Sequence, residues 1–326
     1  MRAIVVERAG GPEVLRIREI PTPQAKPGWV LIRVKAFGLN RAEIYTRQGL
    51  SPGVEFPRVI GIEAVGEVVE DGDGSLAPGQ KVIALIGGMG RDFDGGYAEY
   101  TCVPRAHAVP IESDLDWAHL AAIPETFATV WGGLHVGLEV KSGDSLFVRG
   151  GSSSIGMAAI TMARDLGLRI IASTRQPEKE AMLRDQGAGD VVIGGDQLSG
   201  AVRALIPEGV DKVLELVGIV TLEDSLLATR TGGIVCMTGM LARKWVYEEF
   251  SPMEILPPGV KLTAAGGNAL FARSDASRVM TEICGAVAEG RYRHGLHKQF
   301  AFEDIAEAHR YMESDQAIGK LVVVVD

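Results

Sequence analysis

Cysteine and histidine are scarce in this chain. Its 326 residues include three cysteines, Cys102, Cys236 and Cys284, which stand far apart in the sequence. An odd number of distant cysteines excludes a disulfide framework and fits a reducing cytosol, so we expect three buried thiols that act as small apolar groups. Of the six histidines, His294 and His297 are three apart but have no cysteine nearby, and the other four are isolated, so we expect exposed polar side chains.

Long apolar runs and an excess of positive charge are also absent. No stretch approaches the ~18 consecutive apolar residues of a membrane span, and Met1–Arg8 meets charge too early for a signal peptide. Lys and Arg number 33 against 42 Asp and Glu, which gives a net charge of −9. This balance argues against nucleic acid or an anionic membrane as the partner. The composition predicts a soluble, cytoplasmic enzyme large enough for two domains.

The pattern changes along the chain from strands and turns to alternating strands and helices. Short strand-like segments separated by Gly/Pro turns predict a partly barrel-shaped β domain over the first part; they are residues 30–36, 64–70, 81–86 and 97–103. After Leu120, apolar runs alternate with helix-length segments, which predicts a doubly wound α/β domain with a parallel sheet. Its expected strands are residues 145–149, 168–173, 190–193, 212–217, 233–237 and 261–265. We expect a last strand, Lys320–Val325, to return to the first domain.

A small-residue turn joins the first of these α/β strands to a helix. Strand Ser145–Arg149 runs into a turn and helix start of the pattern G-x-S-x-x-G, made of Gly151, Ser152, Ser153, Ser154, Ile155 and Gly156. Such a turn allows the backbone to approach a pyrophosphate, and the helix N-terminus offers unpaired N–H groups and a partial positive charge. We expect the serine hydroxyls to donate to phosphate as well. Within a βαβ unit this motif predicts a dinucleotide site.

The end of the next strand predicts which dinucleotide binds. An NAD site places an acidic residue about 20 positions beyond the first glycine, on the ribose hydroxyls. Here the strand ends in Ser173, Thr174 and Arg175, and Lys179 follows in the first turn of the next helix. Cations and hydroxyls suit a 2′-phosphate, which a carboxylate would repel. We therefore expect NADPH as the cofactor.

An ordered series of motifs extends over essentially the whole chain. The motifs lie at residues 38–49, 57–68, 79–82, 95–100, 121–129 and 319–323. Together they resemble the zinc-free quinone oxidoreductases of the medium-chain dehydrogenase/reductase superfamily. The resemblance implies a GroES-like substrate domain of residues 1–120 and 268–326, a Rossmann domain of residues 121–267, and a homodimer.

The same resemblance argues against a metal. Zinc-dependent members carry Gly-His-Glu where this chain has Gly61-Ile62-Glu63, and a ligand cysteine near Asn40-Arg41. Isoleucine cannot bind zinc, which needs three or four Cys, His or carboxylate ligands at one point. We therefore expect catalysis without a metal.

Site residues also follow from the resemblance. It implies that Asn40 and Tyr45 lie beside the nicotinamide, with Tyr45 either donating a proton or only packing, whereas Arg47 braces the loop. Further cofactor contacts are implied for Thr126, Thr129, Thr238, Gly239, Met240, Gly266, Gly267 and Asn268. A tyrosine that some relatives place on the adenine side is absent at Gly194, and the segment of residues 241–258 is expected to shape the acceptor pocket.

These residues predict an NADPH-dependent reductase of quinones or α,β-unsaturated carbonyls. Electron-poor substrates need little polarisation, so direct hydride transfer without a metal suffices. Three alternatives stay open: an enoyl-thioester reductase, a non-catalytic NADPH-binding protein, and a zinc-dependent alcohol dehydrogenase.

Overall fold

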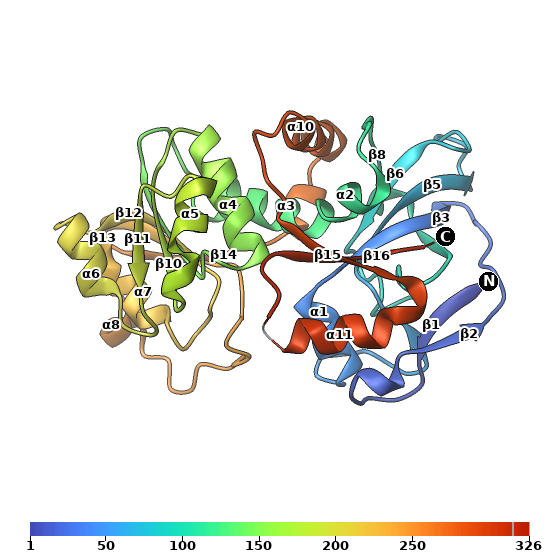
Figure 1. Cartoon of the computed structure of the whole chain (residues 1–326), viewed down its shortest axis with the longest axis horizontal. Helices are drawn as coiled ribbons and strands as arrows, with labels where there is room; N and C mark the ends of the chain where they lie inside the picture. The colour runs from blue at the N-terminus through green and yellow to red at the C-terminus, as the bar shows by residue number, and fades with distance from the viewer. Residues whose placement is uncertain (315, 326) are drawn as a thin grey trace. The chain divides into compact units, whose positions relative to one another are not determined.

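The computed structural model describes residues 1–314 and 316–325, and the chain forms two compact units (Figure 1). Unit 1 comprises Met1–Glu125, Phe271–Glu289 and His294–Asp326, and unit 2 comprises Thr126–Leu270 and Gly290–Arg293. The chain therefore crosses between the units after Glu125, Leu270, Glu289 and Arg293, a few residues from the boundaries at 120 and 267 that the sequence suggests.

Unit 2 is built on a six-stranded sheet in which every pair of neighbours is parallel. The strands are β9 (Ser145–Arg149), β10 (Arg169–Thr174), β11 (Asp190–Ile193), β12 (Val210–Glu215), β13 (Thr229–Met237) and β14 (Lys261–Ala264). Their spatial order is β11-β10-β9-β12-β13-β14. Numbered from β9, this is the 3-2-1-4-5-6 order of dinucleotide-binding folds, with the switch point between β9 and β12. The doubly wound prediction is confirmed.

Helices in unit 2 alternate with these strands along the chain. They are α3 (Pro124–Trp131, which begins in unit 1), α4 (Ser154–Asp165), α5 (Glu180–Gln186), α6 (Ser199–Leu205), α7 (Leu222–Ala228), α8 (Pro252–Ile255) and α9 (Asn268–Phe271). Strand β9 is buried along its whole length, and Phe147, Ile171, Val213 and Val235 from four neighbouring strands share one core cluster. This burial explains the near-continuous apolar runs of the sequence, because a parallel sheet is covered on both faces.

Unit 1 contains a seven-stranded sheet and a three-stranded sheet. The strands are β1 (Arg2–Val6), β2 (Arg16–Glu19), β3 (Trp29–Leu39), β4 (Arg58–Val59), β5 (Glu63–Asp71), β6 (Lys81–Leu85), β7 (Tyr100–Pro104), β8 (Ala108–Pro110), β15 (Leu296–Ala301) and β16 (Lys320–Val324). The helices are α1 (Arg41–Arg47), α2 (Trp117–Ala121), α10 (Ala276–Ala288) and α11 (Ile305–Glu313). The expected GroES-like β domain is confirmed.

The long strand β3 organises unit 1. Along one edge, β3 pairs with β5. Along the other edge, its first half pairs with β7 and its second half with β16, where Leu321 lies opposite Leu39. The return of the C-terminal strand to the first domain is thus confirmed. It places the first residue of β16, Lys320, beside the end of β3, where the candidate site begins.

Three local predictions are wrong. Lys179, expected in the first turn of the next helix, lies instead in a separate 3₁₀ turn, Pro177–Lys179, before α5. Cys236 and Cys284 are buried as expected, but Cys102 is only half-buried. His309, expected at the surface, is fully buried.

In the described part of the chain, no helix combines the length and apolar character that crossing a bilayer requires.

Phe37 tests the packing of unit 1. Its ring is fully buried, stacks on Tyr97 at 4.4 Å between centroids, and meets Phe302 edge-on. We expect Phe37→Ala to lower the free energy of unfolding by about 3–5 kcal/mol, because it removes apolar contacts and leaves a cavity. Urea denaturation would measure this, with Val69→Ala at a 40%-exposed position of β5 as the control. Equal small effects of both variants would contradict the packing described.

Candidate functional site

The turn between β9 and α4 is fixed by contacts that only glycine allows. A Cβ added to Gly156 would lie 2.5 Å from the carbonyl oxygen of Gly150 and 2.7 Å from Cα of Gly151. A Cβ on Gly151 would lie 3.0 Å from Cβ of Ala172, and Gly150 adopts a φ of +86°. The helix start therefore packs directly on the turn. This leaves a cradle of backbone and small side chains at the helix N-terminus, which fits the pyrophosphate of a dinucleotide.

The hydroxyl of Ser153 caps helix α4. Its Oγ accepts a hydrogen bond from the backbone N–H of Gly156 (3.1 Å) and donates to the carbonyl oxygen of Gly150 (2.9 Å). The hydroxyl hydrogen is thus used inside the turn, which differs from the expectation that it donates to phosphate. Ser152 accepts a long hydrogen bond from Thr174 (3.4 Å).

The end of β10 is tied to this turn. Ser173 accepts a hydrogen bond from the N–H of Gly150 through its Oγ (3.0 Å) and one from the N–H of Gly151 through its carbonyl (2.9 Å). Ser173 and Thr174 are buried, whereas Arg175 is exposed and Lys179 is half-buried. Within residues 1–314 and 316–325, neither cation makes an ion pair. The structure thus brings the glycine turn and the end of β10 together and leaves two cations available beside them.

A buried ionic cluster below the turn has no counterpart in the sequence-based predictions. The guanidinium of Arg149, the last residue of β9, pairs with Asp224 and donates to the carbonyls of Gly195 (3.0 Å) and Asp196 (2.7 Å). Glu215, the last residue of β12, lies 4.0 Å from Arg149. The sequence signal that could have revealed this cluster is a charged residue at the end of each of the two apolar strands at the switch point, β9 and β12. The cluster fixes the loop after β11 against β9.

Hydrogen bonds and burial set the charges of this cluster. Glu215 accepts from the N–H groups of Val217 (2.7 Å) and Gly218 (3.0 Å) and from Ser225 (2.5 Å), yet burial raises its pKa. Partial burial opposes ionisation of Asp224 as well, but hydrogen bonds from Arg149 and from the start of α6 outweigh it and lower the pKa of Asp224. Asp224 is therefore the carboxylate that balances Arg149.

The later predicted residues lie at the ends of β13 and β14. Thr238 and Gly239 both donate their N–H groups to the carbonyl of Glu215, at 2.9 and 3.1 Å, and Met240 follows them. Gly266, Gly267 and Asn268 follow β14. Gly132, in a π-helical turn after α3 (Gly132–Gly137), has no room for a Cβ because the carbonyl of Gly266 would lie 2.3 Å away. These segments share the carboxyl edge of the sheet, where ligands bind in open α/β folds.

Thr126 and Thr129 lie on α3, which runs into this π-helical turn, and both are buried. The structure therefore carries all the predicted cofactor residues within unit 2, from Thr126 to Asn268.

Asn40 lies in unit 1 at the centre of a buried polar cluster with Glu43, Glu63 and Lys320. Its side-chain oxygen accepts a hydrogen bond from Lys320 Nζ (2.5 Å), and its amide nitrogen donates to Glu63 (2.8 Å) and Glu43 (3.3 Å). Lys320 also pairs with Glu63 at 2.7 Å, and all three charged residues are almost fully buried. A Cβ on Gly38 would lie 2.3 Å from Glu63, so glycine there makes space for the cluster.

One carboxylate of this cluster is strongly perturbed. Burial raises the pKa of Glu43 from 4.5 to about 7, and the nearby negative charge of Glu63 adds to this rise. The hydrogen bond from the N–H of Ile62 acts in the opposite direction and lowers the pKa. A single ammonium thus faces two carboxyl groups, and near neutral pH one of them holds a proton part of the time. The amide of Asn40 is fixed between them.

Tyr45 is buried on α1, and Arg47 follows it into the core. The Arg47 guanidinium pairs with Glu313 and lies 3.4 Å from Nδ1 of His309, whose Nε2 lies 3.1 Å from the hydroxyl of Tyr97. Burial, with help from Arg47, lowers the pKa of His309 from 6.5 to about 3, so this imidazole is neutral. Arg47 therefore braces α1 against α11.

Across the described part of the chain, no group of three or more His, Cys, Asp or Glu side chains is arranged to hold a metal ion. Ile62 lies in the buried turn between Gly61 and Glu63, where an apolar side chain supplies no ligand.

Comparison with known proteins gives two family matches. Residues 26–113 match the alcohol dehydrogenase GroES-like domain, and residues 186–323 match the family described as zinc-binding dehydrogenase. The chain is 28% identical over 334 residues to the quinone oxidoreductase of Homo sapiens, covering 100% of this chain and 98% of that protein. It is 25% identical to the acryloyl-coenzyme A reductase of Metallosphaera sedula, covering 99% of each.

Solved structures are similar to this chain over its whole length as well. A mycobacterial protein crystallised with NADPH superposes with a TM-score of 0.88 at 26% sequence identity, covering 99% of this chain and 100% of that chain. The similarity therefore extends through both units.

The glycine turn can be tested by adding one methyl group. We expect Gly156→Ala to weaken dinucleotide binding at least tenfold and to lower the melting temperature, because its Cβ would collide with backbone atoms 2.5 Å away. The matched control is Gly285→Ala in α10, where no atom lies within 4 Å of the added Cβ. There we expect a gain of about 0.5–1 kcal/mol in stability and unchanged binding, since alanine favours helix. Calorimetric titration and thermal unfolding measure both; unchanged binding by Gly156→Ala would contradict the cradle.

Glu43→Gln tests the buried carboxyl cluster. Because the pKa of Glu43 is raised from 4.5 to about 7 in the folded state, the folded protein holds a proton that the unfolded chain releases. Wild-type stability should therefore fall, relative to Glu43→Gln, as pH rises through this window, with a slope of up to ~1.4 kcal/mol per pH unit. Urea unfolding of both proteins from pH 4.5 to 8 would show it, and a difference independent of pH would refute it.

Proposed function

We propose that this chain, an oxidoreductase that belongs to the medium-chain dehydrogenase/reductase superfamily and resembles its quinone oxidoreductases, uses NADPH to reduce quinones or α,β-unsaturated carbonyl compounds. The acceptor is a small molecule with an electron-poor carbon or oxygen. Such substrates need little polarisation, so no metal is required in this proposal.

The observation that carries the cofactor proposal is the charge at the end of β10. Arg175 and Lys179 flank the glycine turn without carboxylate partners among the described residues, and no acidic residue ends the strand. A carboxylate there would bind ribose hydroxyls, whereas cations favour a 2′-phosphate. The mycobacterial structural relative was solved with NADPH, which supports the same preference.

NADPH, when bound, supplies the hydride. The residues of this chain hold and orient it: the cradle at Gly151 and Gly156 receives the pyrophosphate, and the ends of β13 and β14 offer backbone groups to the nicotinamide. We propose that Asn40 and Tyr45 lie beside the substrate. Hydrogen bonds with Lys320 and Glu63 hold the side-chain amide of Asn40 in one position beside the substrate. The hydroxyl of Tyr45 orients a substrate oxygen.

Arg175→Ala tests the choice of cofactor. We expect the KM for NADPH to rise about tenfold or more, because one charge-assisted contact to the 2′-phosphate is lost, while the KM for NADH stays within twofold. Arg184→Ala is the matched control, since Arg184 is an arginine of the following helix α5 that pairs with Glu180 (2.9 Å). Steady-state oxidation of each cofactor gives the values. A parallel rise for both cofactors, or a lower wild-type KM for NADH, would overturn the NADPH assignment.

The acceptor requires a panel measured with the wild-type protein. Quinones, enones and enoyl-coenzyme A thioesters should be compared by kcat/KM, and we expect quinones or enones to be preferred. The similarity to an acryloyl-coenzyme A reductase favours thioesters as the second candidate. A higher kcat/KM for thioesters would establish that candidate, and tight NADPH binding without turnover would point to a binding protein.

Homodimerisation is proposed on the resemblance alone. Strand β14 forms one edge of the sheet of unit 2, and this edge is where a partner strand would extend the sheet.

A further inference from the structure

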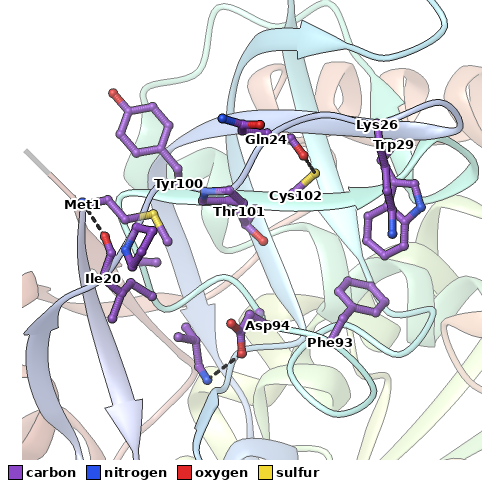
Figure 2. Close-up of a pocket in the computed structure, with 15 residues that line it drawn as sticks. Met1, Ile20, Gln24, Lys26, Trp29, Phe93, Asp94, Tyr100, Thr101 and Cys102 are labelled. Atoms are coloured by element: carbon purple, nitrogen blue, oxygen red, sulfur yellow. Dashed lines mark hydrogen bonds between the residues drawn. The ribbon is translucent and has the colours of Figure 1, made fainter.

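A pocket of about 320 Å³ lies within unit 1, apart from every residue proposed above to bind cofactor or substrate. It lies between strand β7, the start of β1, and the segment that joins β2 to β3 (Figure 2). Its size falls in the range of small-molecule sites. The residues that line it include Met1, Ile20, Gln24, Lys26, Trp29, Phe93, Asp94, Tyr100, Thr101 and Cys102.

Aromatic and apolar side chains form opposite sides of this pocket. Trp29 and Phe93 meet edge to face with ring centroids 5.1 Å apart, and both rings are only half-buried. Figure 2 shows them across the pocket from Met1 and Ile20. A flat aromatic ring would cover these exposed ring surfaces and gain both apolar burial and aromatic contact.

One cation at the pocket has no carboxylate partner. Lys26 Nζ lies 4.3 Å from the ring centroid of Trp29, is exposed, and makes no ion pair within the described residues. The lining carboxylate, Asp94, is already bound by Arg58 Nη1 (3.1 Å) and by the N–H of Val59 (3.0 Å). The available charge on the lining is therefore positive, and it favours an anionic ligand.

One residue of the lining, Thr101, carries a buried hydroxyl with no partner among the described residues. Thr101 is 2% exposed, and its Oγ1 makes no hydrogen bond within the described residues. Leaving such a group unpaired costs about 1–3 kcal/mol, so a ligand oxygen that accepts its hydrogen recovers this energy.

We propose that this pocket binds an aromatic carboxylate. The ring lies against Trp29 and Phe93, the carboxylate faces Lys26, and the hydroxyl of Thr101 donates to an oxygen of the ligand. The site is independent of the proposed reductase activity.

The probe is 2-naphthoate, with its uncharged amide, 2-naphthamide, as the reference ligand. Calorimetric titration of the full chain saturated with NADPH would give both dissociation constants. We expect naphthoate to bind at least threefold more tightly than the amide, because its charge meets Lys26. Failure of naphthoate to bind at millimolar concentration, or equal affinity for both ligands, would overturn the proposal.

Matched variants locate the binding. Lys26→Met should weaken naphthoate about threefold to tenfold and leave naphthamide unchanged, and Thr101→Val should weaken both. The control is Lys298→Met, since Lys298 also lies over an aromatic ring, 4.4 Å from the centroid of Phe300, but outside the pocket. Turnover of NADPH should be unaffected in all three variants. Equal losses for Lys26→Met and Lys298→Met would refute the site.

Discussion

The close packing of helix α4 on the end of strand β9 is the constraint on which the proposed chemistry depends. The helix can start directly above the turn only because Gly156 has no side chain, and its backbone lies against Gly150 and Gly151. That contact aims the free N–H groups of the helix at the carboxyl edge of the sheet. The cap by Ser153 and the bonds from the turn to Ser173 then fix its shape. The proposed phosphate site therefore depends on backbone geometry and not on a charged side chain.

Buried charge serves the same purpose in both units: it fixes a segment that the backbone ladder does not hold. In unit 2, Arg149 reaches from β9 to the loop after β11, and its charge is balanced by Asp224. In unit 1, Lys320 and Glu63 hold the side chain of Asn40, which follows the end of β3. Such pairs contribute little net stability once desolvation is counted, but removing one partner is costly because the other charge stays buried. Both clusters therefore favour one arrangement over alternatives.

Much of the fold was predictable because its signals are local. The near-continuous apolar runs of β9 and β10 require cover on both faces, and the alternation with helices leaves a parallel doubly wound sheet as the outcome. The glycine turn was also predictable from the sequence, because the close backbone contacts that glycine allows depend on that residue itself. Arg175 and Lys179 were identified by position after a strand. Local patterns did not predict the 3₁₀ turn at Pro177–Lys179, nor strands β1 and β2, which are only five and four residues long.

By itself, then, the sequence determined the fold class, the glycine turn between β9 and α4 and the two cations beside it, because each depends on a residue and its near neighbours. Only the tertiary structure decided which polar groups meet. Lys320 lies 280 positions from Asn40 along the chain, and His309 is buried because Arg47 and Tyr97 reach it from other segments. The pocket around Trp29 and Thr101 likewise joins four separate stretches of chain. Charge, burial and missing partners arise from three-dimensional proximity, which no local pattern encodes.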